Sequence, residues 1–469
     1  MPTYEESESL VPLLQSEDVD PSGFQSREDI EEASPLVSAK SLSYYFQRIW
    51  KSHRRKRVVV LAALSAAFII IIIILSIAFR GAATIPEPEE VEEEFAKDPR
   101  LEKYQTLNDT LLCGDWTTPD VRSPISTVSF NLYSSVNLTF FLTRGNPING
   151  QIIIHPERLE SPDHIRVDIT AKHNDLGRKQ LQLSKACLAG QDNEHGIMIW
   201  ADPQTTFSDV TYEIRVHLPD IRDFHDISTD FTNSAVLHDF TVPLDLFSPT
   251  SFDILRIATR NAKITGELFS SQIYIHTTNA EVKGIFAASD VIQIQTSKAP
   301  AYITVITVAK HAEAETSVSI RNKDAAIIVA DISILSRFDH ATLNASVHTT
   351  NGNLIINGHS RIDMPDKAIF LLNASTSNAP ASLHLPKEFQ GTFNMSTTSG
   401  TASLKLNSDQ RDRDGQKRVV SMDIANAKAH KAGKLYWGGE PPESDQGDVK
   451  LKTSKKDVTI SGVHPGNDR

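Results

Sequence analysis

The residues that could do chemistry in this chain do not fall into the spacings that common enzymes use. The 469 residues contain no His-Glu-x-x-His, no phosphate-binding Gly-Lys-Ser/Thr loop, no Gly-x-Gly-x-x-Gly and no Gly-x-Ser-x-Gly. Asp409, Asp412 and Asp414 precede Gly415 in the manner of a calcium loop. The twelfth position of that loop would be Ser421, where calcium needs a bidentate Glu. We therefore expect a charged surface loop there, and no catalytic residue, metal site or cofactor in the chain.

A carbohydrate-active β-helix is the enzymatic alternative, and it needs carboxylates grouped on one face as acid and base. The polar residues that recur in this chain are instead Thr, Ser and Asn. These residues favour turns and hydrogen bonds to sugars or to neighbouring strands, and they do not titrate near neutral pH. His276 and His348 occupy equivalent positions of the repeat described below, which predicts a structural role on a strand face. The pattern favours a protein that is not an enzyme.

Two groups of residues predict covalent modification. The only cysteines are Cys113 and Cys187, and neither has a second Cys or a His at metal-ligand spacing. In an oxidising compartment such a pair is more often bridged than free, so we predict a disulfide. Acceptor triplets for N-linked glycans begin at Asn108, Asn137, Asn344, Asn373 and Asn394.

One uncharged apolar segment, residues 58–79, predicts a transmembrane helix. Its 22 residues would span about 33 Å as a helix, enough for a hydrocarbon core of roughly 30 Å. A cleaved signal peptide is the alternative, but its apolar region would be shorter and nearer the N-terminus. Lys51, Arg54, Arg55, Lys56 and Arg57 precede the segment, so the N-terminus should stay in the cytosol. We expect a single-pass protein of the plasma membrane or of an endomembrane such as the vacuole, with an extracellular or luminal C-terminus.

The parts on either side of this segment are polar and acidic. Residues 1–57 are rich in Ser, Glu, Asp and Pro, which predicts a disordered cytoplasmic tail. Within its basic end, residues 44–57 interleave aromatic and basic side chains, as expected of a strip that rests on anionic lipid headgroups. Residues 80–110 predict an acidic stalk. The net charge of −12, with no basic cluster outside the strip, argues against nucleic acid as a partner.

The tail also contains a possible sorting signal. Leu13 and Leu14 follow an acidic stretch and resemble a dileucine signal for sorting adaptors, although Ser9 occupies the usual acidic position. Phosphorylation of Ser9 would supply the missing charge. Two leucines in a solvated acidic tail are the alternative interpretation.

From about residue 250 onward one strand phrase returns: apolar, any, apolar, any, then Thr or Asn. The residues at its fifth position are Thr259, Thr277, Thr296, Asn322, Thr349, Thr376, Thr397, Asn426 and Thr453, where the copies at Asn322 and Asn426 are the weaker ones. Most copies are followed, after a turn of Asn, Gly or Lys-Ala, by a second apolar alternation such as Leu354 to Gly358. Alternation of period two predicts half-buried strands, so each unit should be strand, turn, strand.

Such a unit cannot bury its apolar face alone, whereas stacked copies can. We therefore predict an all-β ectodomain in which residues 251–465 form stacked coils of a β-solenoid, with a β-sandwich as the alternative. His217-Leu-Pro and His384-Leu-Pro introduce similar stretches, so residues 111–250 should be a β-rich region of the same architecture.

The phrases HTTNAEVKG, VHTTNGNLIING and LHLPKEFQGTFNMSTTSGTASLKL resemble the "putative adhesin" (head-domain type) β-solenoid family over residues 210–462. The layout of tail, helix and ectodomain resembles fungal membrane-anchored members. In several coils Ala, Lys or Asp replaces the turn Gly of the family. The resemblance implies adhesion, wall contact or scaffolding, with a glycan, cell-wall polymer or protein as partner, and it assigns no binding residue. A sorting or receptor-like protein and a glycan-active enzyme remain the alternative functions.

Overall fold

A computed structural model describes most of the chain from Asp98 onward. The described residues are 98–104, 111–118, 122–157, 159, 161–219, 222–239, 250–311, 313–336, 341–357, 368–386, 389–406, 411, 415–424, 427–438 and 447–462. The apolar segment 58–79, Leu13, Leu14 and Asn108 lie outside them. Among the described residues no helix is long and apolar enough to cross a membrane.

The described chain is all-β, with one 3₁₀ helix, η1 (Pro99–Tyr104), and one α-helix, α3 (Asp175–Leu181). The strands are β1 (Leu112–Gly114), β2 (Ile125–Tyr133), β3 (Leu138–Gly145), β4 (Asn149–Glu157), β5 (His164–His173), β6 (Ser184–Gln191), β7 (Glu194–Ala201), β8 (Val210–Pro219), β9 (Arg222–Phe231), β10 (Asn233–Asp239), β11 (Thr250–Thr259), β12 (Ile264–Thr277), β13 (Val282–Thr296), β14 (Ala301–Ala309), β15 (Ala314–Asn322), β16 (Ile327–Ser336), β17 (Ala341–Thr349), β18 (Leu354–Asn357), β19 (Ile369–Thr376), β20 (Ala381–Leu385), β21 (Gly391–Thr397), β22 (Ala402–Lys405), β23 (Arg418–Ile424), β24 (His430–Trp437), β25 (Gly447–Thr453) and β26 (Val458–Gly462).

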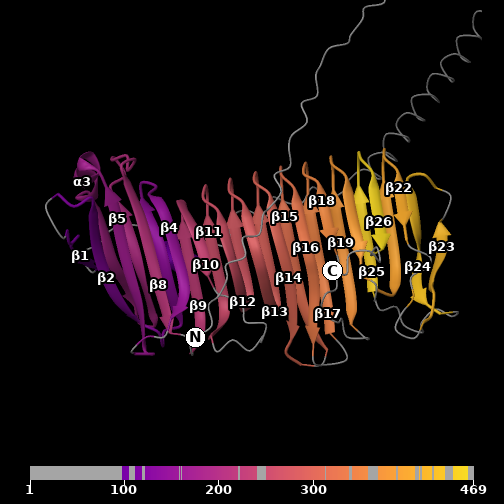
Figure 1. Cartoon of the computed structure of the whole chain (residues 1–469), viewed down its shortest axis with the longest axis horizontal. Helices are drawn as coiled ribbons and strands as arrows, with labels where there is room; N and C mark the ends of the chain where they lie inside the picture. Colours follow the sequence, from indigo (N-terminus) through magenta and orange to yellow (C-terminus); the bar gives the residue numbers. More distant parts are fainter. Residues whose placement is uncertain are drawn as a thin grey trace, which may run out of the picture. The chain divides into compact units, whose positions relative to one another are not determined.

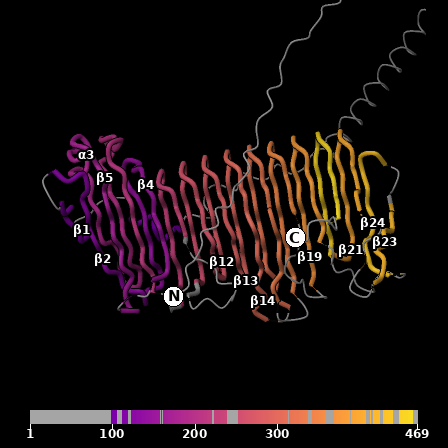
Figure 2. The backbone as a smooth tube through the Cα atoms, in the orientation of Figure 1, coloured from indigo at the N-terminus to yellow at the C-terminus, as the bar shows by residue number. Residues whose placement is uncertain are grey.

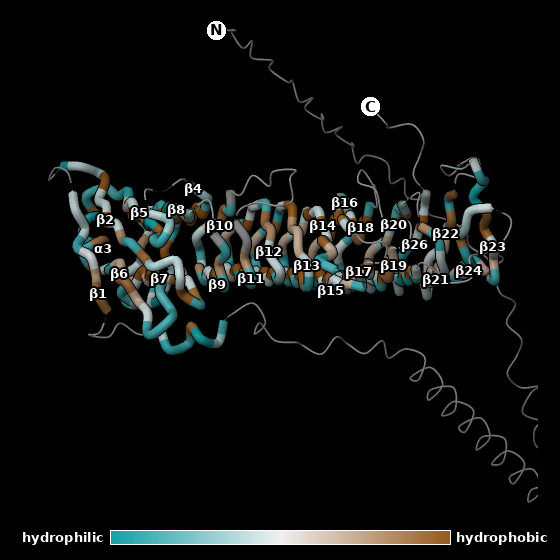
Figure 3. Tube along the Cα trace, turned by 90° about the horizontal axis from the view of Figure 1, so that it is seen from below, coloured by the Kyte–Doolittle hydropathy of each residue, from teal (hydrophilic) through white to brown (hydrophobic). Residues whose placement is uncertain are grey.

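The strands form two facing layers (Figure 3). Layer A runs in the spatial order β1, β6, β7, β3, β9, β11, β12, β13, β15, β17, β19, β25, β21, β24, β23. Layer B runs β2, β5, β8, β4, β10, β12, β13, β14, β16, β18, β20, β26, β22. The long strands β12 and β13 belong to both layers, because each pairs along its two halves with different neighbours. The sheet stays open, since neither layer closes on itself.

The repeated phrase corresponds to one pass of the chain through both layers, as the sequence predicts. Its fifth-position residues lie side by side in layer A, in the order Thr259, Thr277, Thr296, Asn322, Thr349, Thr376, Thr453 and Thr397. The pairing between successive passes is parallel and in register (Figure 1). The two shortest passes contain β12 and β13, which cross from layer B to layer A without a loop. Later passes use separate strands for the two layers.

The core lies between the layers and follows the predicted alternation. In β15 the buried side chains are Ala314, Thr316, Val318, Ile320 and Asn322, while the residues between them face outward. Burying an aliphatic side chain of this kind contributes roughly 1.5–3 kcal/mol. A lone pass would leave this face in water, so the strands are stable only as a stack.

The threonines at the fifth position are buried, and from Thr296 onward their hydroxyls are hydrogen-bonded. Thr349 is 0% exposed; its Oγ1 donates to the carbonyl of Ala325 in the preceding pass at 3.1 Å and accepts from the Gly352 amide at 3.2 Å. Thr376 repeats the bond with the carbonyl of Gly352 at 3.1 Å. In these passes the Thr hydroxyl closes its own turn or joins the pass to its neighbour in the stack.

At the C-terminal end the order of the coils in space differs from their order in the sequence. β25 lies between β19 and β21, and β26 lies between β20 and β22, so the last copy of the phrase enters the stack before the copy at Thr397 (Figure 1). β23, predicted as a further coil through Asn426, instead pairs antiparallel with β24 at the end of layer A (Figure 2). Asn426 itself lies outside the described residues. Period-two alternation determines which face of a strand is buried, but not which strand is its neighbour.

Residues 98–219, the entry section, are built differently from residues 222–462, the coil stack. In the entry section β1 with β6, β2 with β5, β5 with β8 and β6 with β7 are antiparallel pairs. Cys113 and Cys187 face each other across β1 and β6 and form a disulfide. Parallel pairs of β3 with β9 and β4 with β10 continue both layers into the coil stack.

Candidate functional site

The outward face of layer A carries rows of polar side chains. Because strands pair in register, equivalent outward positions align from pass to pass. One row runs Gln293, Ser319, Ser346, Asn373, and a second runs Gln295, Arg321, His348, Ser375. Gln293, Ser319 and their neighbours are half-buried or exposed and point to the solvent side of their strands. The rows present hydroxyl and amide groups at a constant rise of about 4.8 Å per strand.

The two histidines of this repeat lie where the sequence places them, on a strand face. His276 and His348 share one register position but are separated by Gln295 and Arg321. The Nδ1 of His348 lies 2.8 Å from the Ser375 hydroxyl. Burial, together with the nearby Arg321 guanidinium, lowers the pKa of His348. A neutral imidazole bonded to a neighbouring serine suits a structural position.

Three of the predicted glycan acceptors also lie on the outward face of layer A. Asn344, Asn373 and Asn394 have exposed side chains on β17, β19 and β21. Asn344 Nδ2 donates to Glu315 at 3.2 Å, and Asn394 Oδ1 lies 3.1 Å from His430. Asn137 is exposed just before β3. The structure thus brings three acceptors onto one face, which the spacing of the triplets alone did not show.

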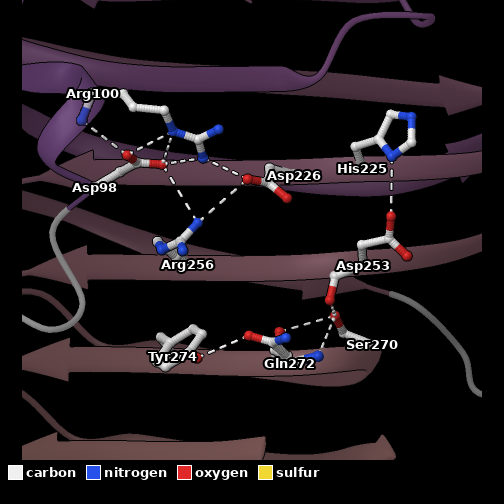
Figure 4. A network of polar contacts seen from close by, with 9 residues as sticks. All are labelled: Asp98, Arg100, His225, Asp226, Asp253, Arg256, Ser270, Gln272 and Tyr274. Carbon is white, nitrogen blue, oxygen red and sulfur yellow. Dashed lines mark hydrogen bonds and ion pairs between the residues drawn. The ribbon is translucent and has the colours of Figure 1, made fainter. Parts of the chain in front are cut away.

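A charged network fastens η1 to layer A at the junction of the entry section and the coil stack (Figure 4). The Asp98 carboxylate accepts from Arg100 at 2.9 and 2.6 Å and lies 3.4 Å from Arg256. Asp226 on β9 accepts from Arg100 at 2.5 Å and lies 3.5 Å from Arg256. Two carboxylates face two guanidinium groups, so the network is neutral as a whole.

The electrostatics of this network keep Asp98 ionised. Burial acts to raise the pKa of Asp98, but the hydrogen bonds and charge of Arg100 and Arg256 outweigh it, and the pKa is lowered. The hydrogen bond that Arg100 donates to Asp98 correspondingly raises the pKa of Arg100. Neither group can exchange a proton near neutral pH, so the network fits a structural clamp and not acid–base catalysis.

The same clamp corrects the prediction for part of the stalk. Residues 98–104 fall within the predicted stalk of residues 80–110, yet they pack on layer A. Leu101 and Tyr104 are 3% and 6% exposed and join Leu138, Phe140 and Leu142 of β3 in a small second core. Tyr104 and Phe140 have ring centroids 4.7 Å apart. Acidic residues flank this short apolar pair in the sequence, so the local pattern did not indicate that the pair is buried.

A histidine and carboxylate cluster lies on the outward face of layer B in the entry section. His155 and Glu157 come from β4, and His217 comes from β8 and is 7% exposed. One ligand atom from each of the three lies within 4.8 Å of the other two. Glu157 Oε2 contacts His217 Nδ1 and lies 3.9 Å from His155 Nε2. The sequence analysis predicted no metal site and missed this group, because His217 is distant from His155 in sequence.

Comparisons with known proteins add little to this picture. No family model matches the chain, and no curated protein matches it. A "putative adhesin" of Bacteroides fragilis has 9% identity and a TM-score of 0.28, covering 72% of this chain and 97% of that chain. A "putative lipid binding protein" of Parabacteroides distasonis has 10% identity and a TM-score of 0.27, covering 72% and 97%. A "putative cell adhesion protein" of Clostridium sporogenes has 6% identity and a TM-score of 0.16, covering 72% and 100%. At such low scores the fold rests on the strand pairing described above.

Proposed function

We propose that this chain is a non-enzymatic, single-pass membrane protein whose β-solenoid domain serves adhesion, wall contact or scaffolding outside the cytosol. The observation that carries the proposal is the set of polar rows on the outward face of layer A. A stack of parallel, in-register passes is stiff and presents the same side-chain types repeatedly. A surface of this kind suits a partner that is itself repetitive, such as a glycan or a cell-wall polymer.

The chemistry of the rows indicates how such a partner would bind. Gln293, Ser319 and Ser346 are register neighbours with neutral donors and acceptors. Each hydrogen bond to a sugar hydroxyl contributes only about 1 kcal/mol net. Affinity would therefore come from many weak contacts along one polymer chain, as in multivalent binding. Monosaccharides should bind poorly to the same surface.

Membrane anchoring belongs to the same proposal and rests on the sequence. Residues 58–79 are long enough to span a bilayer, and the basic residues before them favour a cytosolic N-terminus. The β-rich domain would then face the lumen or the cell exterior, where the Cys113–Cys187 disulfide is stable. A protease-protection assay on intact vesicles, with tags at both ends of the chain, tests this topology.

Retention of cells on immobilised polymer tests the adhesive role. Cells displaying the full-length chain are passed over insoluble wall polysaccharides, and the double variant Gln293→Ala with Ser319→Ala is compared with the unmodified protein. Loss of two hydrogen bonds should weaken binding to the polymer about 30-fold and reduce retention accordingly. The matched control is Ser382→Ala with Thr459→Ala, a register pair on the outward face of layer B. Retention on no polymer, or equal loss in the two double variants, would contradict the proposal.

A further inference from the structure

We propose that His155, Glu157 and His217 bind a divalent cation of the zinc type, with Asp168 as the outer carboxylate that orients His217. The proposal is independent of the adhesive role. It rests on the strand pairing that brings these side chains together, on the distances between their ligand atoms and on the residues that contact them.

The strands of layer B place the three ligands on one face. His155 and His217 are direct partners in the parallel pairing of β4 with β8. His155 and Glu157 are two residues apart on one strand, so they point to the same side. The two imidazoles meet edge to face, with ring centroids 4.7 Å apart. The pairing of two regular strands therefore brings the three side chains together, and no long or flexible loop is needed.

The distances suit a metal between the three side chains. Zinc lies about 2.1 Å from His nitrogen and carboxylate oxygen, so two ligands of a tetrahedral ion are about 3.4 Å apart. The ligand atoms here all lie within 4.8 Å of one another. The Glu157 side chain is 42% exposed and can rotate. A small rotation of this carboxylate closes the site around an ion.

The second ring nitrogen of His217 has the partner that metal-binding histidines use. His217 Nδ1 faces Glu157, while Nε2 lies 3.2 Å from Asp168 Oδ2. Neither ring nitrogen makes a well-directed hydrogen bond within the described part of the chain. A histidine that binds a metal through one nitrogen commonly directs the other N–H at a carboxylate, which fixes the ring and raises its basicity.

Asp168 is itself held in place. The Ser129 hydroxyl donates to its Oδ1 at 2.7 Å, and Arg166 Nε donates to its Oδ2 at 3.0 Å. Arg166 also lies 3.7 Å from Glu157. With neutral imidazoles, two carboxylates against one guanidinium leave a net negative charge, which a divalent cation offsets.

Charge pairing without a metal is the competing explanation. A protonated His217 between Glu157 and Asp168 would also be satisfied. That account involves His217 alone, whereas His155 Nε2 also lies 3.9 Å from the same carboxylate oxygen. A single cation accepts both imidazoles and the carboxylate together.

The donor set selects the class of cation. Two imidazoles and one carboxylate suit zinc and its neighbours in the first transition row, whereas calcium and magnesium prefer sites made only of oxygen. Three protein ligands leave a fourth position for water or for a group of another molecule.

Metal titration of the full-length chain tests the proposal. The protein is solubilised in detergent, freed of metal with a chelator and titrated with Zn²⁺ against a chromophoric indicator. A parallel titration uses Co²⁺, whose visible absorption reports tetrahedral coordination. We expect one tight site per chain and an absorption band typical of a tetrahedral ion. Absence of a tight Zn²⁺ site would overturn the proposal.

Single variants separate a metal site from an ion-pair cluster. His155→Ala and Glu157→Gln remove partly exposed ligands, and each should weaken Zn²⁺ binding at least 100-fold. Asp168→Asn leaves all three ligands and should weaken it 10- to 100-fold. The matched control is His225→Ala, because His225 is an exposed histidine 3.0 Å from Asp253 on layer A. Circular dichroism confirms that each variant is folded. Unchanged Zn²⁺ affinity in His155→Ala and Glu157→Gln would overturn the site.

Discussion

The entry section and the coil stack continue the same two layers but hold their strands together by different means. Apart from the antiparallel strands β23 and β24, the coil stack uses parallel pairing, one recurring strand phrase and a buried Thr or Asn in each copy of it. The entry section has antiparallel pairs, a disulfide, the helix α3 and the clamp of η1. In the coil stack each pass makes the same contacts to its neighbour. The entry section has no repeat, so it depends on individual interactions such as the disulfide and the clamp. The two regions should therefore be destabilised by different substitutions.

Removing the disulfide should have the largest effect, and it should be confined to the entry section. Cys113 and Cys187 close a loop of 74 residues, and losing such a crosslink costs about 4 kcal/mol through chain entropy. In the double variant Cys113→Ala with Cys187→Ala, hydrogen exchange should rise in β1, β2, β5 and β6. Protection in β15 and β17 should stay unchanged. Uniform loss of protection along both regions would show that they unfold as one unit.

Breaking the clamp should come next, at about 2–3 kcal/mol. Asp98→Asn leaves Arg100 and Arg256 with one carboxylate in a largely desolvated place. The depressed pKa of Asp98 means that its stabilisation is fully present above about pH 4, the unfolded value. That stabilisation is lost as the pH falls through the lower, folded value. Hydrogen exchange of residues 98–104 at neutral and acidic pH measures both effects.

The acid dependence is the control for this prediction. In the unmodified protein, residues 98–104 should lose protection on acidification, whereas Asp98→Asn should start unprotected and change little. If the variant still showed the acid-induced step, another acid would be responsible.

Removing one threonine hydroxyl from the coil stack should cost about 2 kcal/mol. Thr349→Val keeps the shape but leaves the Ala325 carbonyl and the Gly352 amide without the hydroxyl of a fully buried side chain as their partner. Thermal unfolding of the variant measures the loss. The matched control is Thr350→Val at the next, half-buried position, which should change stability by less than about 0.5 kcal/mol. Equal effects at the two positions would contradict the assignment of the buried ladder.

The asparagines at the turns should have the smallest effect, about 0.5–1 kcal/mol. Asn351 donates to Asp324 at 2.7 Å and accepts from Asn378 at 2.6 Å, but these bonds are exposed to solvent. Asn351→Ala should therefore lower the melting temperature less than Thr349→Val does. If the exposed bonds contributed more than the buried ones, the order of the comparison would be reversed.

The sequence predicts the coil stack well for a physical reason. A phrase that recurs with alternating apolar residues and a fixed Thr sets strand type, buried face and register together. The register partners Thr349 and Thr376 were therefore identified without the structure. The entry section has no recurring strand phrase. Neither the pairing of β2 with β5 nor the packing of Leu101 could therefore be deduced from the sequence.

The candidate cation site was visible only in part. His155-Pro-Glu157 places two ligand types on one strand face, which is a usable signal in the sequence. His217 lies beside these two residues only because β4 pairs with β8, and no local sequence pattern predicts that pairing. The polar rows of layer A, by contrast, follow directly from the repeat, because register aligns every outward position.

The place of β25 and β26 in the stack has a consequence for synthesis of the chain. The residues that separate β19 from β21 in space leave the ribosome after both of those strands, as do those that separate β20 from β22. Until residues 447–462 emerge, β19 and β21 in layer A and β20 and β22 in layer B each have an edge without a partner. A chain that ends before residue 447 would keep those edges exposed, and an exposed strand edge is a template for pairing with another chain. The strands β25 and β26 must therefore be synthesised before the pairing of both layers can be complete.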